Sequence, residues 1–141
     1  MILFVSALEF NVKKINMKNL IIDAAKDKIF FKIITDNQSY TSDHANSREN
    51  FDKFVTLLFD FLKENKINIK EINNIFVNQG PGKFSGIRTS ISVAKALSVT
   101  NKLNLYGFDS GEVKNGNYDK IIDLFNKELL IKNLIKPQYL S

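Results

Sequence analysis

The sequence contains no cysteine and only one histidine, His44, among its 141 residues. Without cysteine, neither a disulfide framework nor a cysteine-based zinc site can form. A zinc site made from histidine and carboxylates usually takes several imidazoles, so a single histidine argues against a metal centre as well. We therefore expect no metal and no cofactor in this protein.

Long apolar runs are also missing. The apolar stretch at the N-terminus, residues 1–10, is shorter than the roughly 20 residues that a membrane-spanning helix needs. It also lacks the basic start and the small-residue cleavage site of a signal peptide. Met17 opens a segment that resembles the start of a domain, so residues 1–16 are either an N-terminal extension or a misassigned start. We expect a cytoplasmic protein that does not bind membranes.

Arginine is scarce, because the chain has eighteen lysines but only two arginines, Arg48 and Arg88, for a net charge of +5. The cations are spread along the sequence and form no dense basic cluster. Charge alone therefore gives only weak support to a nucleic-acid-binding surface. The abundance of lysine, asparagine and isoleucine is typical of the codon bias of an AT-rich genome.

The pattern of apolar residues predicts one α/β domain with a mixed five-stranded sheet and flanking helices. Short apolar runs bounded by turn residues predict strands at residues 20–23, 29–35, 38–41, 75–78 and 103–108. Helical spacing of apolar residues predicts helices at residues 47–64, 84–101 and 118–135. A chain of this length is expected to form a single core.

The most informative stretch is residues 75–99, in which a short apolar strand leads into a glycine-rich turn and then a helix. Its marker residues are Gly80, Gly82, Gly86 and Arg88. Their spacing matches neither a Walker A loop, nor a dinucleotide-binding fingerprint, nor a nucleophile elbow. Two interpretations remain: the glycines allow close helix–sheet packing, or the N-terminus of the helix binds an anion. The spacing favours packing, with Arg88 fixing the turn or its interface.

No set of catalytic residues can be assembled from the sequence. Asp23 ends the first predicted strand, where actin-like and sugar-kinase-like ATPases keep a metal-associated acid, but aspartate is also a common turn residue. His44 precedes a predicted helix and is expected in its capping region rather than as a general base. Asp109 and Ser110 follow the fifth predicted strand and are most simply a helix or turn cap. We therefore expect no catalytic residues.

The first two predicted helices are apolar on more than one side, which predicts a contact between helices of two chains. The second helix is rich in small residues that let another helix approach closely. The residues expected at this contact are Leu57, Phe61, Ser90, Ala94 and Leu97. Leu57→Asp or Ala94→Trp is expected to weaken the association and to leave the fold largely intact. The alternative is that the third predicted helix covers the excess apolar surface.

Several segments resemble one known family. Residues 80–88, GPGKFSGIR, resemble the GPGSFTGLR signature of the TsaB family, and residues 93–97 resemble its AKGLA continuation. Residues 17–34 resemble the usual opening of the family, a strand ending in Ile-Asp followed by a hairpin. Residues 137–141 resemble its closing P-x-Y-L-R, with Ser141 in place of the arginine. The likeness extends to about residue 110 and resumes at the last few residues.

The resemblance implies a ribonuclease-H-like half of the actin-like ATPase (ASKHA) fold. Members of the family have two such halves, whereas the second half is nearly absent here. The sequence therefore resembles a short form, with a ribonuclease-H-like N-terminal domain at residues 17–110 and a C-terminal helix and tail at residues 111–141. In such a form, Asp23 is a candidate for a vestigial nucleotide-site acid.

The TsaB family takes part in the threonylcarbamoyladenosine (t6A) modification of tRNA. The resemblance implies a non-catalytic subunit that dimerises with the catalytic TsaD subunit through two long helices and supports its transfer reaction. It also implies indirect partnership with a TsaE-like ATPase and with tRNA, and a homodimer when the chain is alone. Two alternatives stay open: a truncated ASKHA-type nucleotide-binding phosphotransferase that uses Asp23 and the glycine turn, and a basic tRNA-binding module.

Overall fold

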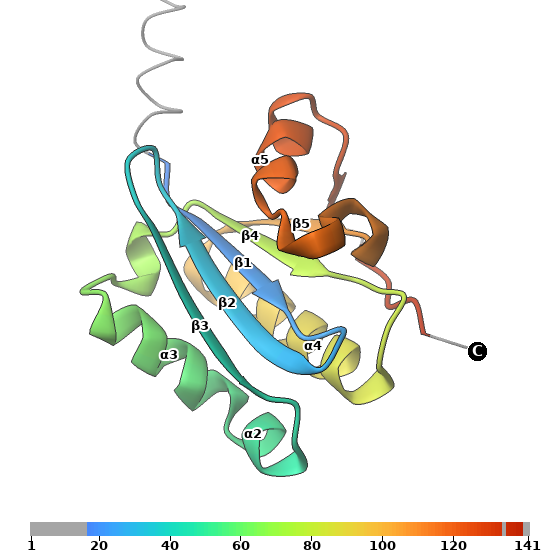
Figure 1. Ribbon diagram of the computed structural model, residues 1–141. Helices are drawn as coiled ribbons and strands as arrows, with labels where there is room; N and C mark the ends of the chain where they lie inside the picture. The colour runs from blue at the N-terminus through green and yellow to red at the C-terminus, as the bar shows by residue number, and fades with distance from the viewer. Residues whose placement is uncertain (1–16, 134, 140–141) are drawn as a thin grey trace, which may run out of the picture.

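The computed structural model describes residues 17–133 and 135–139 of the chain, and the described residues contain a six-stranded sheet in the order β3-β2-β1-β4-β5-β6 (Figure 1). The prediction for residues 1–16 lies outside this range. The strands are β1 (Asn19–Asp23), β2 (Lys28–Ile34), β3 (Ser39–Ala45), β4 (Asn74–Asn78), β5 (Asn104–Phe108) and β6 (Ile131–Lys132). The sheet is mixed, because β1, β4 and β5 run parallel while β2, β3 and β6 pair antiparallel with their neighbours.

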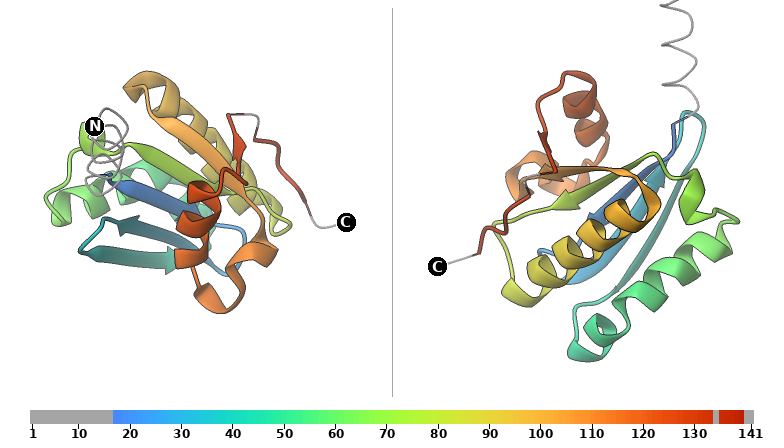
Figure 2. Two further views of the ribbon diagram at one scale, coloured as in Figure 1. Left: turned by 90° about the horizontal axis from the view of Figure 1, so that it is seen from above. Right: turned by 180° about the vertical axis from the view of Figure 1, so that it is seen from behind.

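Helices cover both faces of this sheet. They are α2 (Arg48–Asp52), α3 (Phe54–Glu64), α4 (Phe84–Asn101) and α5 (Asp119–Asn126), with short 3₁₀ segments η1 (Ile69–Glu71) and η2 (Ser110–Gly116). Figures 1 and 2 show α3 and α4 side by side on one face and α5 on the other. No helix among the described residues is both long enough and apolar enough to cross a membrane.

Two apolar cores lie against opposite faces of the sheet, because successive side chains of a strand point to opposite sides. In β1, Leu20 and Ile22 belong to the larger core under α3 and α4, whereas Ile21 belongs to the smaller core under η2 and α5. The smaller core also contains Phe76, Phe108, Val113 and Ile121. Both cores therefore share the central strands, which are buried along their whole length.

The structure corrects three predicted elements. The helix predicted at residues 47–64 is broken at Lys53, where the backbone leaves the helical region (φ −115°, ψ 27°). The strand predicted at residues 38–41 continues to Ala45, so His44 lies within β3 opposite Ile29 and outside the capping region. Ser47 caps α2 instead, since its side chain accepts a hydrogen bond from the backbone N–H of Asn50.

The third correction concerns the C-terminal part of the chain. The helix predicted at residues 118–135 ends at Asn126, and the prediction of five strands is wrong by one. Glu128, just after this helix, adopts a left-handed backbone conformation (φ 58°), and Asn133, just after residues 131 and 132, adopts another (φ 64°). Residues 131 and 132 then pair with β5 as β6. The apolar run around this strand is too short for its periodicity to distinguish a strand from a helix.

Candidate functional site

The glycine turn connects β4 to α4 and packs against the backbone of its own chain. A Cβ atom added at Gly82 would collide with the carbonyl oxygen of Ala25, and one added at Gly86 would collide with that of Ala24. The backbone N–H of Lys83 donates a hydrogen bond of 2.9 Å to the same Ala25 carbonyl. The two glycines thus let the start of α4 lie directly on the loop between β1 and β2.

The C-terminal segment covers the other side of the turn. The backbone N–H of Gln138 donates to the carbonyl of Gln79 at 2.7 Å, and Tyr139 forms an isolated parallel bridge with Gly82. Gly80 has φ 110°, a value that L side chains rarely adopt, and a Cβ at this position would meet the backbone of Gln138. The carbonyls on both sides leave no room at the glycines for a phosphate, so the geometry favours packing over anion binding.

Asp23 lies at the end of β1 and is 4% exposed. Its Oδ1 accepts hydrogen bonds from the backbone N–H of Ala25 and from Nδ2 of Asn78, both at 3.1 Å. Its Oδ2 accepts a hydrogen bond of 2.7 Å from the hydroxyl of Tyr118. Both carboxylate oxygens are therefore occupied by donors of the same chain, which is the expected environment for a buried charge with a structural role.

Tyr118 closes this site from the second face of the sheet. Its ring stacks on Phe30 at a centroid distance of 4.7 Å and meets Phe108 edge-on at 6.4 Å. Burial raises the pKa of the Tyr118 hydroxyl, and the negative charge and hydrogen bond of Asp23 raise it further. A shallow cavity of about 290 Å³ remains beside this pair, with lysines 26 and 28 at its rim.

Asp109 and Ser110 hold the glycine turn in place. Asp109 occupies the N-cap position of η2 without a side-chain capping bond, and its Oδ1 instead accepts from Nε2 of Gln79 at 2.8 Å. The backbone N–H of Ser110 donates to the carbonyl of Gly80 at 2.8 Å. Asn78 completes the arrangement, because its Oδ1 accepts from the Gly80 N–H at 2.8 Å. The sequence analysis missed Asn78 and Tyr118, which no local motif marks.

The residues predicted to bind a partner occupy different environments. Four of them are buried, since Phe61 is 2%, Ser90 0%, Ala94 0% and Leu97 8% exposed, and all of these but Ser90 belong to the larger core. Only Leu57, which is half-buried, reaches the surface. A partner therefore cannot touch the other four directly in this conformation, and Ala94→Trp would disrupt the core instead of leaving the fold intact.

The exposed apolar side chains of the helix layer lie elsewhere on the same helices. On α3, Val55 is 48% and Phe59 is 38% exposed, whereas on α4 Phe84 is 53% and Val99 is 78% exposed. Arg88 is exposed as well, and its guanidinium lies 5.8 Å from the centre of the Phe84 ring. Arg88 therefore packs on the surface beside the turn.

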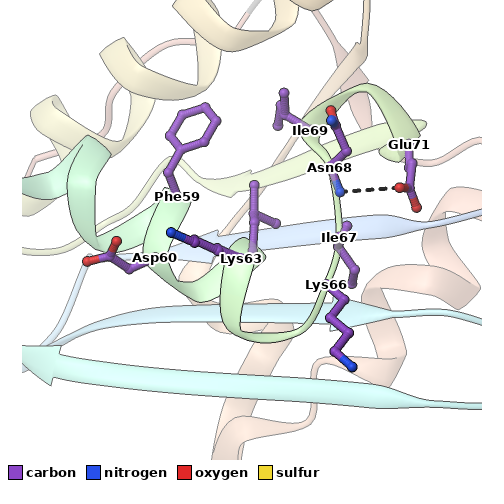
Figure 3. Close-up of a pocket in the computed structure, with 9 residues that line it drawn as sticks. Phe59, Asp60, Lys63, Lys66, Ile67, Asn68, Ile69 and Glu71 are labelled. Carbon is purple, nitrogen blue, oxygen red and sulfur yellow. Dashed lines mark hydrogen bonds between the residues drawn. The ribbon is translucent and has the colours of Figure 1, made fainter.

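An open groove of about 560 Å³ continues the surface of α3 beyond its C-terminal end. It is lined by Phe59, Asp60, Leu62, Lys63, Lys66, Ile67, Asn68, Ile69 and Glu71. Phe59 and Ile69 extend toward the same side, while Lys66 extends away from them (Figure 3). The backbone N–H of Asn68 donates a hydrogen bond of 3.4 Å to Oε1 of Glu71, and this bond stabilises the segment around η1 that lines the groove. Apolar side chains between separated charges suit a protein surface better than a compact polar substrate.

The described residues contain no group of three histidine, cysteine, aspartate or glutamate side chains that could hold a metal ion. Asp23 has no second carboxylate among its hydrogen-bond partners. The arrangement around the turn is thus a set of internal hydrogen bonds between neighbouring elements.

Comparison with known proteins adds a family context. A family model described as "TsaD: tRNA N6-adenosine threonylcarbamoyltransferase" matches residues 37–114. A protein of Buchnera aphidicola subsp. Schizaphis graminum named tRNA threonylcarbamoyladenosine biosynthesis protein TsaB is 30% identical over 91 residues, or 64% of this chain and 43% of the relative. The protein of the same name from Buchnera aphidicola subsp. Baizongia pistaciae is 32% identical over 65 residues, or 40% of this chain and 29% of the relative.

Among solved structures, YeaZ from Pseudomonas aeruginosa superposes with a TM-score of 0.64 at 14% sequence identity. The superposition covers 79% of this chain and 50% of that one, and at this identity it shows the fold alone. The chain thus spans less than half the length of the curated relatives and about half the length of this structural neighbour.

Proposed function

The chain belongs to the TsaB family, and we propose that it acts in tRNA threonylcarbamoyladenosine biosynthesis as a non-catalytic partner of a TsaD-like catalytic subunit. The names of the curated relatives support the pathway. The ribonuclease-H-like half of the actin-like ATPase fold provides the scaffold. The observation that carries the partner role is the exposed apolar surface of α3, which adjoins an open groove.

The internal hydrogen bonds of the glycine turn support the non-catalytic part of the proposal. A catalytic carboxylate has to reach substrate or metal, whereas both oxygens of Asp23 already accept hydrogen bonds from neighbouring groups. The backbone of the turn is likewise engaged with Ala25 and with Gln138. In the proposed mechanism, the turn fixes the start of α4 and thereby the helix layer that docks on the partner.

The outer surface of α3 supports the docking part of the proposal. Val55 and Phe59 are one helical turn apart and both point to solvent, with half-buried Leu57 nearby. Burying such surface gains about 25 cal/mol per Å² before the costs of association. Phe84 and Val99 of α4 extend the apolar surface along the second helix of the layer. Without the partner, the same layer would pair with a second copy of the chain.

The C-terminal part of the chain has a proposed role of its own. Residues 17–110 would form the ribonuclease-H-like domain of the family. Val113 and Ile121, from residues 111–141, cover the second face of its sheet. This segment would keep that face from solvent in the absence of the family's second half. The chain itself would then contact the TsaE-like ATPase and tRNA only indirectly, through the other members of the complex.

The partner role can be tested by affinity capture of a TsaD-like subunit with Val55→Asp and Phe59→Asp variants. We expect each variant to weaken capture at least tenfold, because a charge enters the centre of the proposed interface. The matched control is Leu129→Asp, since Leu129 is 65% exposed and lies outside the helix layer. Undiminished capture by both α3 variants, or equal loss with the control, would contradict the proposed interface.

A further inference from the structure

Strand β3 forms one margin of the sheet and is open along its outer side. Its seven residues pair one to one with β2, without a bulge. Figures 1 and 2 show β3 as the outermost strand, while the described helices pack on the two faces of the sheet. The strand at the opposite margin, β6, has only two residues, one of them Lys132. Short length, lysine and proline commonly protect an edge from pairing, and β3 has none of these features.

The hydrogen bonds at the two ends of the β2–β3 hairpin show which backbone groups of β3 face outward. The N–H of Thr35 donates to the carbonyl of Gln38 at 2.9 Å, and the N–H of Asn46 donates to the carbonyl of Asp27 at 3.3 Å. Hydrogen-bonded pairs in an antiparallel ladder recur at every second residue. The even-numbered residues of β3 therefore bond to β2, whereas its odd-numbered residues turn their N–H and C=O groups away from the sheet.

The outward-facing residues are Ser39, Thr41, Asp43 and Ala45, and all four are exposed. The carbonyl of Ala45 accepts a hydrogen bond of 2.8 Å from Nδ2 of Asn50, as its outward direction allows. Within residues 17–133 and 135–139, no hydrogen bond to the backbone groups of the other three is seen. Such a row of free donors and acceptors is the template on which a further strand adds to a sheet.

A second copy of β3 complements this edge in an antiparallel register. When a two-fold axis passes between the two copies of Ser42, all seven residues overlap. Thr41 of one copy then lies opposite Asp43 of the other, so the threonine hydroxyl donates to the carboxylate. On the opposite face of the sheet, the ring of Tyr40 faces that of His44. No two like charges lie opposite each other in this register, because Asp43 is the only acidic or basic residue besides His44.

Ser42 gives a second, independent reason for this register. Its Oγ is buried and has no hydrogen-bond partner among the described residues. Buried polar atoms are normally hydrogen-bonded, so this hydroxyl lacks a partner that a complete interface would supply. On the two-fold axis, the two Ser42 residues form a non-hydrogen-bonded backbone pair, the kind in which facing side chains come closest. Their hydroxyls are thus placed to bond to each other.

We propose that the chain forms a homodimer by antiparallel pairing of β3 with β3 of a second copy, so that two sheets become one. The contact uses the margin of the sheet and not Val55 or Phe59, which the proposed function assigns to the protein partner. It goes beyond that function and does not depend on it. One pair of strands buries less surface than the roughly 1,200–2,000 Å² of stable interfaces, so the dimer is weak and depends on concentration.

Engineered cysteines test the register, because the chain itself has no cysteine. Ser42→Cys places two sulfurs in a directly opposite pair with Cα atoms about 4.5 Å apart, which a disulfide spans. Thr41→Cys is the matched control, since the two copies of residue 41 lie diagonally, roughly 7–8 Å apart. After mild oxidation, non-reducing electrophoresis should show at least tenfold more linked dimer for Ser42→Cys. Both variants carry Phe59→Asp, which prevents pairing through the helix layer.

Thr41→Pro tests the backbone bonds of the interface. The N–H of Thr41 faces the open edge, so proline removes a donor from the interface but none from the β2–β3 ladder. Sedimentation velocity should show a dissociation constant raised at least tenfold. Thr41→Ser keeps both the N–H and the hydroxyl and should stay within about twofold of the unchanged chain. Circular dichroism shows whether each variant is folded, and the cysteine pair decides if Thr41→Pro is not.

Three outcomes would overturn the inference: equal linking of the two cysteine variants, an undiminished dimer in folded Thr41→Pro, or a chain that stays monomeric up to about 1 mM. Capture of a TsaD-like subunit separates this inference from the proposed function. Thr41→Pro should capture that subunit as well as the unchanged chain does. A chain that dimerises through β3 but captures no such subunit would contradict the proposed function and support the inference.

Discussion

At the scale of single residues, Gly82 and Gly86 decide how closely α4 can approach the loop between β1 and β2. Neither residue adopts an unusual backbone conformation, so glycine is needed at these positions because there is no space for a side chain. The carbonyl oxygens of Ala24 and Ala25 occupy the positions where side chains would begin. A glycine signature that looked like a ligand loop in the sequence is therefore explained by the contact between two backbone segments.

Gly86→Ala tests this explanation. The added methyl group would meet the backbone of Ala24, which cannot move without shifting β1, so we expect the free energy of unfolding to fall by about 3 kcal/mol. Gly111→Ala is the control, because a Cβ at Gly111 meets no atom within 4 Å. Urea unfolding followed by circular dichroism measures both, and equal effects of the two substitutions would refute the spatial argument.

The hydroxyl of Tyr118 gives a second prediction at this scale. Tyr118→Phe leaves Oδ2 of the buried Asp23 without its donor, and we expect a loss of about 2 kcal/mol in unfolding free energy at neutral pH. Tyr106→Phe is the control, since the ring of Tyr106 stacks on Phe76 and no hydrogen bond of its hydroxyl is seen among the described residues. A similar loss in both variants would contradict a specific role of the Tyr118–Asp23 bond.

Because of the same hydroxyl, we expect the free energy of unfolding to depend on pH in the alkaline range. The folded state raises the pKa of Tyr118 above its ordinary value of 10.0, so above that pH the unfolded chain releases a proton that the folded chain retains. The unfolding free energy should therefore fall as pH rises through 10. The fall should be smaller in Tyr118→Phe and unchanged in Tyr106→Phe, as unfolding curves across this pH range would show.

At the scale of elements, α4 has two faces with different compositions. Its inner face buries Ser90 and carries Ala94 and Leu97 into the larger core, whereas Arg88, Lys95 and Lys102 are exposed. The small residues on the inner face let the helix lie close to its own sheet. The sequence analysis recognised the small residues correctly but assigned them to a contact between chains, because periodicity alone does not tell which face meets the sheet.

Helix α5 depends on one buried anchor. Ile121 is 0% exposed and is the buried residue of this short helix, in contact with the second core. Ile121→Ala should lower the unfolding free energy by about 3 kcal/mol, from lost burial and from the cavity left behind. Leu129→Ala, at a residue that is 65% exposed, should change it by less than about 0.5 kcal/mol. Urea denaturation distinguishes these values, and a null effect of Ile121→Ala would show that α5 adds nothing to the fold.

At the scale of the whole molecule, helices pack against both faces of a single sheet. The α/β class, the mixed sheet and the helix after the glycine turn could be predicted because they follow from local periodicity and spacing. The bonds of Asp23 to Asn78 and to Tyr118 could not, since they join residues 55 and 95 positions apart. The sixth strand also escaped prediction, because two residues show no periodicity.

The pairing of Gln138 with Gln79 has a practical consequence for handling the protein. It brings the last described residues to the carboxyl ends of the parallel strands, beside the glycine turn. Met17, by contrast, lies at the amino ends, where Lys18 contacts Asn73. An affinity tag or fluorescent fusion joined directly after Tyr139 would therefore begin next to Phe84 and obstruct that corner. A tag placed ahead of Met17 would leave the corner free for measurement.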